Sequence, residues 1–357
     1  MLSGRGSKRV KWLVGVVLVI GALAAVGWWW MGRPLYEPGH VRAEQRLTAP
    51  LEPPAQDDAA TWLVEDGVMI AHRSVGAGPR VLVVHGGPAI PFTVVPPGFQ
   101  RLGERFELVL VDQRGCGGST RPIDRLTGGY AENMETLETS LGLGAQVADL
   151  ERIRRILGDE QLVLMGHSFG GLIAALYAIE FPERVRGLVL VAPADLLTMP
   201  SPSGDLFELV RDKLPVGRHD EYDTFIGEYM NFGALFGETD ESLAARQGRF
   251  AGFFAAATGA PSPPPSIPGA GGFAPFAMYL GLGQRHDWAE AAAMITAPTL
   301  LVHGDEDVVP VEASRSYARA IEGARVEVLE GSGHFPFTDR ADEFARVVGE
   351  FLDNLSE

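Results

Sequence analysis

One stretch near the middle of the chain constrains the fold more than any other. The apolar run Leu162–Met165 leads into Gly166-His-Ser-Phe-Gly170, and an apolar helix former, Leu172–Ala178, follows at once. A strand that turns into a helix through Gly-x-Ser-x-Gly is typical of a nucleophile elbow, where the serine sits in a tight, strained turn above a sheet. Glycines flank the serine because a Cβ at those positions would collide with the neighbouring strand or helix. The pattern predicts Ser168 as a catalytic nucleophile; a Gly-rich turn without chemistry is the alternative.

Short apolar strands alternate with helical segments on both sides of this stretch. Asp66-Gly67 separates two strand-like runs, which predicts a hairpin. The remaining elements are predicted from apolar runs and from helical periodicity: strands at 80–84, 106–111, 187–192, 298–303 and 325–329, and helices at 146–157, 311–321 and 339–352. Strands that are apolar throughout and alternate with helices form a mostly parallel sheet with helices on both faces. The predicted fold class is therefore α/β.

The alternation stops between residues 196 and 295. Aromatic-rich helical patterns and a Pro/Gly-rich stretch replace it. We interpret residues 196–295 as a mostly helical cap over the active site, with a second domain of unrelated role as the alternative. The core is then predicted in two parts, residues 61–195 and 296–357.

The N-terminal region predicts a membrane anchor. Residues 12–31 form an uncharged apolar run of 20 residues, basic residues crowd its N-terminal side, and Trp28–Trp30 lie near its other end. This length spans a bilayer, and the charge bias places the N-terminus in the cytoplasm. We therefore expect residues 1–33 to be a single-pass anchor and the catalytic domain to be periplasmic or on the cell surface; a cleaved signal peptide is the alternative. Residues 34–60, rich in Pro, Ala and charge, are predicted to be a tether.

Charge and cysteine content narrow the classes of partner. The formal net charge is −16, and residues 34–357 hold 25 basic and 46 acidic residues. So acidic a body argues against nucleic acid as a partner. It fits a cationic substrate or simply solubility. Cys116 is the sole cysteine, which excludes an intramolecular disulfide or a thiolate metal site, and no metal-ligand or phosphate-loop motif is present. We expect no metal and no cofactor; the sequence does not indicate an oligomeric state.

A serine nucleophile needs a base, and the base needs an orienting carboxylate. Gly304-Asp-Glu-Asp307 and Gly333-His334 follow the last two predicted strands, so Ser, Asp and His occur in the chain order expected of a strand–turn–helix nucleophile. His334 is predicted to be the general acid/base. Asp305 and Asp307 both remain open as its orienting carboxylate.

The negative charge that develops on the substrate oxygen needs two backbone donors. We predict the N–H of Phe169, directly after the serine, as one donor. The second is predicted at Gly87, in His85-Gly-Gly-Pro88 after the strand at 80–84. His85 is expected to shape this loop rather than to take a proton.

These motifs together carry a family resemblance. His85-Gly-Gly-Pro88, Asp112-Gln-Arg-Gly-Cys-Gly-Gly-Ser119 and the elbow, with the Asp and His loops, resemble the proline iminopeptidase-like branch of the α/β-hydrolases. The resemblance implies an α/β-hydrolase fold and Asp307 as the orienting carboxylate. It also implies a short-peptide or other small-molecule substrate, from which proline or another small residue is released through an acyl-enzyme. Two positions depart from the branch: Ala89 replaces a further glycine, and the elbow Gly-His-Ser-Phe-Gly is closer to that of esterase-like relatives.

Peptidases of this branch resemble one another in holding the substrate's free amine with acidic residues near the cap. Glu228 is the first choice here, followed by Glu238 and Asp240, and a solvated helix position is the alternative for Glu228. The sequence thus predicts a serine hydrolase, with an aminopeptidase as the first hypothesis. An esterase or acyl hydrolase of small apolar esters is the second, and a non-catalytic binding protein on the same scaffold is the third.

Overall fold

A computed structural model describes residues 32–57, 60–258 and 267–355. Eight strands form one sheet in the order β1-β2-β4-β3-β5-β6-β9-β10. They span the following residues: β1 Thr61–Glu65, β2 Val68–Val75, β3 Arg80–Val84, β4 Glu107–Val111, β5 Leu162–His167, β6 Val185–Val191, β9 Thr299–Gly304 and β10 Arg325–Leu329. These strands match the predicted ones to within two or three residues at most ends.

One strand of the sheet, β2, runs opposite to both of its neighbours. β1 and β2 form the predicted antiparallel hairpin, and β2 also pairs antiparallel with β4. From β4 to β10 all pairs are parallel, with Val84 of β3 opposite Val111 of β4 and Gly166 of β5. The carboxyl ends of β3, β4, β5, β6, β9 and β10 therefore meet at one edge, where the motif-bearing loops lie.

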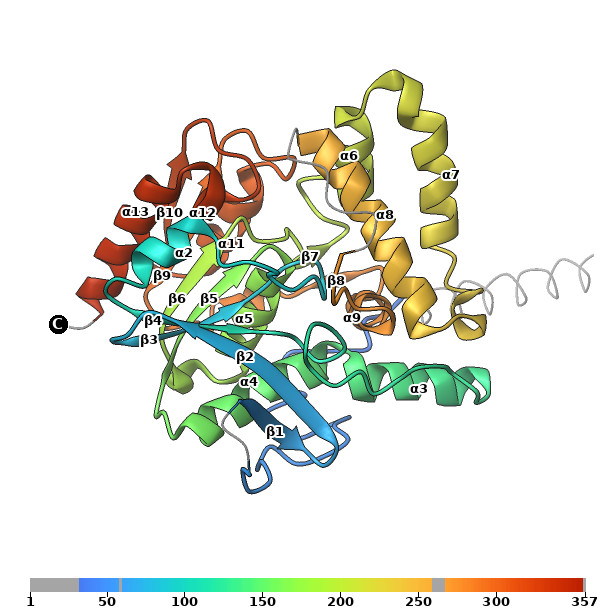
Figure 1. Cartoon of the computed structure of the whole chain (residues 1–357), viewed down its shortest axis with the longest axis horizontal. Coiled ribbons are helices and arrows are strands. Elements are labelled where there is room, and N and C mark those ends of the chain that lie inside the picture. Colours follow the sequence, from blue (N-terminus) through green and yellow to red (C-terminus); the bar gives the residue numbers. More distant parts are fainter. Residues whose placement is uncertain (1–31, 58–59, 259–266, 356–357) are drawn as a thin grey trace, which may run out of the picture.

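Alternating side chains build two apolar layers, one on each face of the sheet. On β3, Leu82 and Val84 face the layer that contains helices α4 and α5, while Val81 and Val83 face the layer of α2, α12 and α13. The helices of the first layer are α3 Tyr130–Leu141, α4 Leu143–Leu157, α5 Phe169–Glu180 and α11 Glu312–Ala320; those of the second are α2 Pro97–Leu102, α12 Pro336–Asp339 and α13 Ala341–Asn354. This is the predicted α/β arrangement, and Figure 1 shows the sheet between its helices.

The interval predicted as a cap is mostly helical. It contains α6 Leu206–Lys213, α7 His219–Tyr229, α8 Asp240–Thr258, α9 Phe273–Leu282 and α10 Ala289–Ala292. In Figure 1, α6, α7 and α8 stand together to one side of the sheet. Helix α9 instead packs against α3 and α4 of the core. Two short strands, β7 Thr198–Met199 and β8 His286–Asp287, pair antiparallel where the interval leaves the core and returns to it.

Helix α3 was not predicted from the sequence. Only Asn133, Leu137 and Leu141 of its 12 residues are buried, so its apolar stripe is too thin to produce a clear helical period. It ends at Gly142, and α4 begins directly afterwards.

The interval predicted as a tether, residues 34–60, is not a free linker. Tyr36, Val41 and Leu51 are buried against the core. The buried Glu180 carboxylate, at the end of α5, accepts hydrogen bonds from the Tyr36 hydroxyl (2.9 Å) and from the backbone N–H groups of Gly39 (2.8 Å), Val41 (3.2 Å) and Arg42 (3.0 Å). The polar composition of this interval did not indicate these contacts, because Glu180 lies 138 to 144 residues away in the sequence from the groups that bond it.

The predicted membrane anchor, residues 12–31, lies outside the described residues. Among residues 32–57, 60–258 and 267–355, no helix combines the length and the apolar character needed to cross a membrane.

The Glu180 contacts make a testable prediction. Glu180→Gln replaces a charged acceptor by a neutral amide, and the amide N–H then faces a backbone N–H that also donates. We therefore expect the free energy of unfolding to fall by about 1–3 kcal/mol. Trypsin should also cleave faster after Arg42 and Arg46 in the folded protein. The matched control is Glu183→Gln, which removes only the exposed partner of Arg42 and should cost about 0–1 kcal/mol. Equal cleavage rates in Glu180→Gln and the wild type would contradict the assignment.

Candidate active site

The elbow lies between β5 and α5, with Ser168 in a conformation that few non-glycine residues adopt. Its φ is 52° and its ψ is −120°, which costs on the order of 1–3 kcal/mol and is typical of functional turns. Gly166 and Gly170 make the turn feasible. A Cβ on Gly166 would overlap the backbone of Gly170, and a Cβ on Gly170 would overlap the carbonyl oxygens of Val84 and His85.

Asp307 and His334 form a buried pair at the same edge of the sheet. The Nδ1–H of His334 donates to Oδ2 of Asp307 at 2.8 Å, and Oδ1 of Asp307 accepts the backbone N–H of Val309 at 3.0 Å. Burial raises the pKa of the Asp307 carboxyl, but the charge of His334 and the hydrogen bonds from His303 and His334 outweigh it and hold the pKa well below its usual range. Asp307 is therefore ionised at neutral pH. The proton on Nδ1 leaves Nε2 of His334 with its lone pair, the state required of a general base.

His167, the residue before Ser168, ties the elbow to the His334 loop. Its Nε2–H donates to the carbonyl oxygen of His334 at 2.9 Å. The ring is buried and lies against the rings of His334, Phe335 and Phe337. Burial lowers the pKa of His167 to about 3, so the ring is neutral at physiological pH. Hydrogen bonds thus link the residue before Ser168 to the backbone of His334, and the ring of His334 to Asp307, at one edge of the sheet.

The loop after β3 lies directly against the elbow. A Cβ on Gly86 would come within 2.8 Å of the Ser168 Cβ, and Gly87 has a φ of +122°, which favours glycine. The side chain of Gln113 bridges the loop: its Nε2 donates to the His85 carbonyl (2.6 Å), and its Oε1 accepts the Ala89 N–H (3.2 Å). Both ring nitrogens of His85 are bonded to backbone groups, of Gly86 and of Gln113, so His85 shapes the loop as expected.

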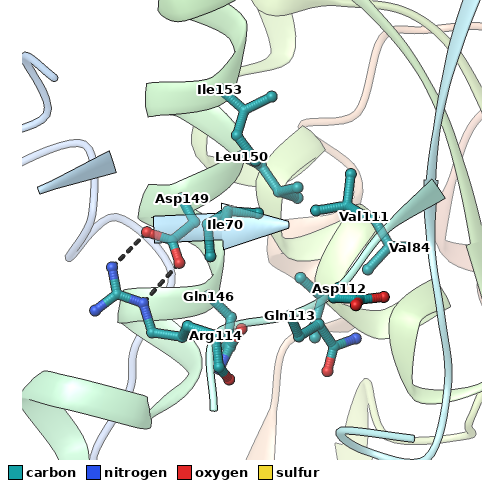
Figure 2. Close-up of a pocket in the computed structure, with 11 residues that line it drawn as sticks. Ile70, Val84, Val111, Asp112, Gln113, Arg114, Gln146, Asp149, Leu150 and Ile153 are labelled. Carbon is teal, nitrogen blue, oxygen red and sulfur yellow. Dashed lines mark hydrogen bonds and ion pairs between the residues drawn. The ribbon is translucent and has the colours of Figure 1, made fainter. Parts of the chain in front are cut away.

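A buried ion cluster lies next to Gln113 in the chain and is centred on Arg114. Arg114 pairs with both carboxylate oxygens of Asp149, and its Nη1 donates to Oε1 of Glu65 at 2.9 Å. Figure 2 shows Arg114 and Asp149 beside a cavity of about 10 Å³ that Asp112 and Gln113 also line. A cavity of this size holds at most about one water molecule, so it is a packing feature and not a substrate site.

Two aromatic side chains of the inserted interval lie beside the predicted site residues His334 and Phe169. The ring of Phe254, from α8, lies 5.2 Å from the ring of His334, and the ring of Tyr279, from α9, lies 5.9 Å from that of Phe169. The inserted interval therefore supplies one aromatic ring beside His334 and another beside Phe169. A wall of aromatic rings favours substrates with an apolar part.

Comparison with known proteins identifies the family. The model of the alpha/beta hydrolase fold matches residues 79–341, most of the chain. The chain belongs to the α/β-hydrolase family. Proline iminopeptidases from Saccharolobus solfataricus and Heyndrickxia coagulans are each 26% identical to this hydrolase; the alignments cover 80% and 78% of this chain and 88% and 92% of the relatives. The solved structure of an esterase from Exiguobacterium antarcticum has a TM-score of 0.51 at 25% identity and covers 81% of this chain and 97% of that one.

The predicted family resemblance is thereby confirmed. The parallel sheet, the matching family model and the peptidase and esterase relatives make this α/β-hydrolase a hydrolytic enzyme. Ser168 lies in the turn between β5 and α5, Asp307 and His334 lie in the loops after β9 and β10, and Gly87 lies in the loop after β3. The catalytic triad and the backbone donors at Gly87 and Phe169 were predicted from the sequence. Their catalytic roles stay predictions.

No contact among the described residues joins Glu228, the predicted amine-binding residue, to Ser168 or His334. Its side chain is 60% exposed on α7 and pairs with Arg249 of α8 at 3.5 Å. The two alternatives are also engaged elsewhere: Glu238 pairs with Arg246, and Asp240 pairs with Arg121 and accepts the Phe273 N–H. A solvated helix position, the alternative for Glu228, describes it correctly. Sequence could not decide this, because it does not show which face of α7 turns toward the elbow.

Sequence reasoning missed the roles of Gln113 and His167. Gln113 was noted only as part of a family motif, although its place after β4, next to the end of β3, was a signal that it meets the His-Gly-Gly-Pro loop. Cys116 of the same motif is buried, and burial raises the pKa of its thiol well above the usual value, so it is no nucleophile. Within the described part of the chain, no cluster of His, Cys, Asp or Glu has the geometry of a metal site.

His167 makes the stability of this hydrolase depend on pH. The ring stays neutral in the folded state down to about pH 3, whereas it takes up a proton near pH 6.5 once unfolded. Between these values the unfolded state binds the extra proton, so the free energy of unfolding falls as pH falls, by about 1.4 kcal/mol per pH unit from this group.

We therefore expect His167→Gln to flatten the curve of unfolding free energy against pH between pH 6 and pH 4. Denaturant melts at half-unit pH steps measure the slope. At pH 8 the His167 ring is neutral in both the folded and the unfolded state. The difference in unfolding free energy between His167→Gln and the wild type at that pH therefore reports only lost packing and hydrogen bonding. Parallel curves for the variant and the wild type would show that His167 is not held neutral.

Proposed function

We propose that the enzyme is a serine hydrolase that works through an acyl-enzyme. The observation that carries this proposal is the His334–Asp307 hydrogen bond of 2.8 Å, which leaves Nε2 of His334 as a base, on a loop bonded to the residue next to Ser168. The strained backbone of Ser168 and the glycine loop against its Cβ support the same assignment.

The proposed reaction uses only the groups at this edge of the sheet. Oγ of Ser168 attacks the substrate carbonyl while its proton passes to Nε2 of His334. The N–H groups of Phe169 and Gly87 hold the oxyanion, where the loss of one such donor costs about 100- to 1,000-fold in rate. His334 then gives its proton to the leaving amine or alcohol. Water, activated by the same ring, releases the acyl group from Ser168.

The first substrate proposal is a peptide with a free N-terminus, from which proline or another small residue is released. It rests on the two proline iminopeptidases at 26% identity over about four-fifths of this chain. The motifs that carry the resemblance also contact one another here, since Gln113 of one motif bridges the His85–Pro88 loop of the other. The acidic body of the chain fits a substrate that bears a cationic amine.

The second proposal is an esterase of small apolar esters. Two observations favour it: the aromatic rings of Phe254 and Tyr279 beside the catalytic groups, and the engagement of Glu228, Glu238 and Asp240 with arginines. An ester substrate needs no carboxylate to hold an amine. The esterase at 25% identity supports the same proposal.

The deciding experiment uses the full chain, purified in detergent, with Ser168→Ala as the control. A fluorophosphonate probe should label the wild type and leave Ser168→Ala unlabelled. Turnover is then measured on aminoacyl anilides, led by proline and alanine, and on short-chain p-nitrophenyl esters. We expect the anilides with a free amine to be cleaved and the same anilides with a blocked amine to be spared.

Each result assigns the enzyme to one class. Ester cleavage without anilide cleavage would replace the peptidase proposal with the esterase. Folded wild-type protein that resists the probe would instead favour a binding protein on a hydrolase scaffold. Because Glu228 is exposed and paired outside the site, Glu228→Gln should change kcat/KM less than about two-fold on either panel.

We further propose that residues 12–31 anchor the enzyme in a membrane with the catalytic domain outside the cytoplasm. The support is the 20-residue apolar run and the basic residues before it. Alkaline phosphatase fused after Glu357, active only outside the cytoplasm, should be active in the producing cell. Activity of a cytoplasm-specific reporter at the same position would reverse this topology.

A further inference from the structure

The Asp307 carboxylate has a second histidine neighbour that the reaction does not use. His303, at the end of β9, is fully buried, and its Nε2 lies 3.3 Å from Oδ2 of Asp307, the same oxygen that receives Nδ1–H of His334. Nε2 also lies 2.9 Å from the carbonyl oxygen of Val309. The His303 ring therefore contacts both the Asp307 carboxylate and the backbone of Val309, two residues further along the same loop.

The bonding partners of His303 determine which nitrogen carries its proton. A carbonyl oxygen can only accept, so Nε2 must carry the hydrogen that reaches Val309 and Asp307. In the neutral ring Nδ1 is then an acceptor, and the buried hydroxyl of Ser314, on α11, lies 2.8 Å from it. Ser314 thus donates to Nδ1 and holds the tautomer that places a hydrogen on Nε2, which bonds the Val309 carbonyl and lies 3.3 Å from Oδ2 of Asp307.

His303, Val309 and the Asp307 carboxylate form a closed cycle of contacts. His303 bonds the Val309 carbonyl, the Val309 N–H bonds Oδ1 of Asp307, and His303 reaches Oδ2. Both oxygens of Asp307 are thereby held by the protein, and the direction from Oδ2 to His334 is fixed. A carboxylate held at one oxygen alone would be free to turn about its terminal bond.

We propose that His303 is a positioning residue that acts through Asp307, with Ser314 as the group that sets its tautomer. This inference rests on the proposed triad. It predicts that loss of the Nε2–H contact lets Asp307 turn, so that His334 is less often oriented toward Ser168. A misplacement on the order of 1 Å can cost about 100-fold in rate, which bounds the expected effect.

The test compares variants in the full-length protein. His303→Leu removes the donor, whereas His303→Gln keeps an N–H near the place of Nε2. We expect His303→Leu to lower kcat and the rate of Ser168 labelling by about 10- to 100-fold with KM nearly unchanged, and His303→Gln to recover most of that loss. Ser314→Ala should lower both rates by a smaller factor.

Matched controls separate positioning from folding. His286→Leu also removes a histidine with two backbone hydrogen bonds, to Leu282 and Leu196, but at the base of the inserted interval. Ser316→Ala removes a hydroxyl of α11 that bonds within its own helix. Both controls should keep wild-type labelling rates per folded molecule, whatever their melting temperatures.

A spectroscopic signal tests the inference without turnover. The proton on Nδ1 of His334, hydrogen-bonded to Asp307, is expected in the low-field ¹H NMR spectrum and should disappear in His334→Gln. His303→Leu should shift or broaden it and His303→Gln should keep it. The NMR comparison does not depend on labelling. If the wild type resists the fluorophosphonate probe, that failure counts against the proposed function and not against the role of His303.

Two results would overturn the inference. One is a His303→Leu variant that folds, keeps the low-field signal and labels at the wild-type rate. If His303→Leu does not fold, Ser314→Ala decides instead: labelling and a low-field signal indistinguishable from those of Ser316→Ala would reduce His303 to a buried structural histidine.

Discussion

The close approach of backbone to backbone at the elbow is the constraint on which the rest of the site depends. Gly166 and Gly170 let α5 begin directly against β5, and Gly170 also lets it press on the carbonyl oxygens at the end of β3. The nucleophile and the loop proposed to hold the oxyanion therefore share one contact surface. A single added methyl group at Gly170 would separate these two parts of the site.

Buried charge holds the surrounding loops in place. Arg114, Asp149, Glu65 and Arg152 connect the loop after β4 with α4 and with the edge hairpin, and each charge is paired. Removing one member of such a cluster leaves an unpaired buried charge and costs about 3–5 kcal/mol. Gln113 directly precedes Arg114 in the chain. The residue that hydrogen-bonds the His85–Pro88 loop is therefore held in place by its neighbour in the ion cluster.

Patterns within short stretches of sequence predicted the features that depend on neighbouring residues alone. The apolar runs and the glycines of the elbow placed the strands, the nucleophile turn and the loops of Asp307 and His334. Contacts between distant segments could not be predicted. Glu180 binds residues 36–42 because the fold brings them together, and nothing in the polar composition of residues 34–60 indicates this. The pairing of Glu228 with Arg249 could not be predicted either, because helical period gives the faces of α7 but not which face meets α8.

The pairing of β7 with β8 has a consequence for how enzymes of this shape diversify. Thr198 and Met199 lie opposite Asp287 and His286, so residues 200–285 leave the core and return to it at one point. The ribbon joins the two ends of this interval, and within the interval α9 makes a second contact with the core through α3 and α4. Since the entropy of closing a loop grows only slowly with its length, segments of the interval that make no contact with the core can change in length at little cost to the sheet. Such a junction fixes where both ends of the inserted interval meet the core, so a change in length within the interval need not move the turn that carries Ser168.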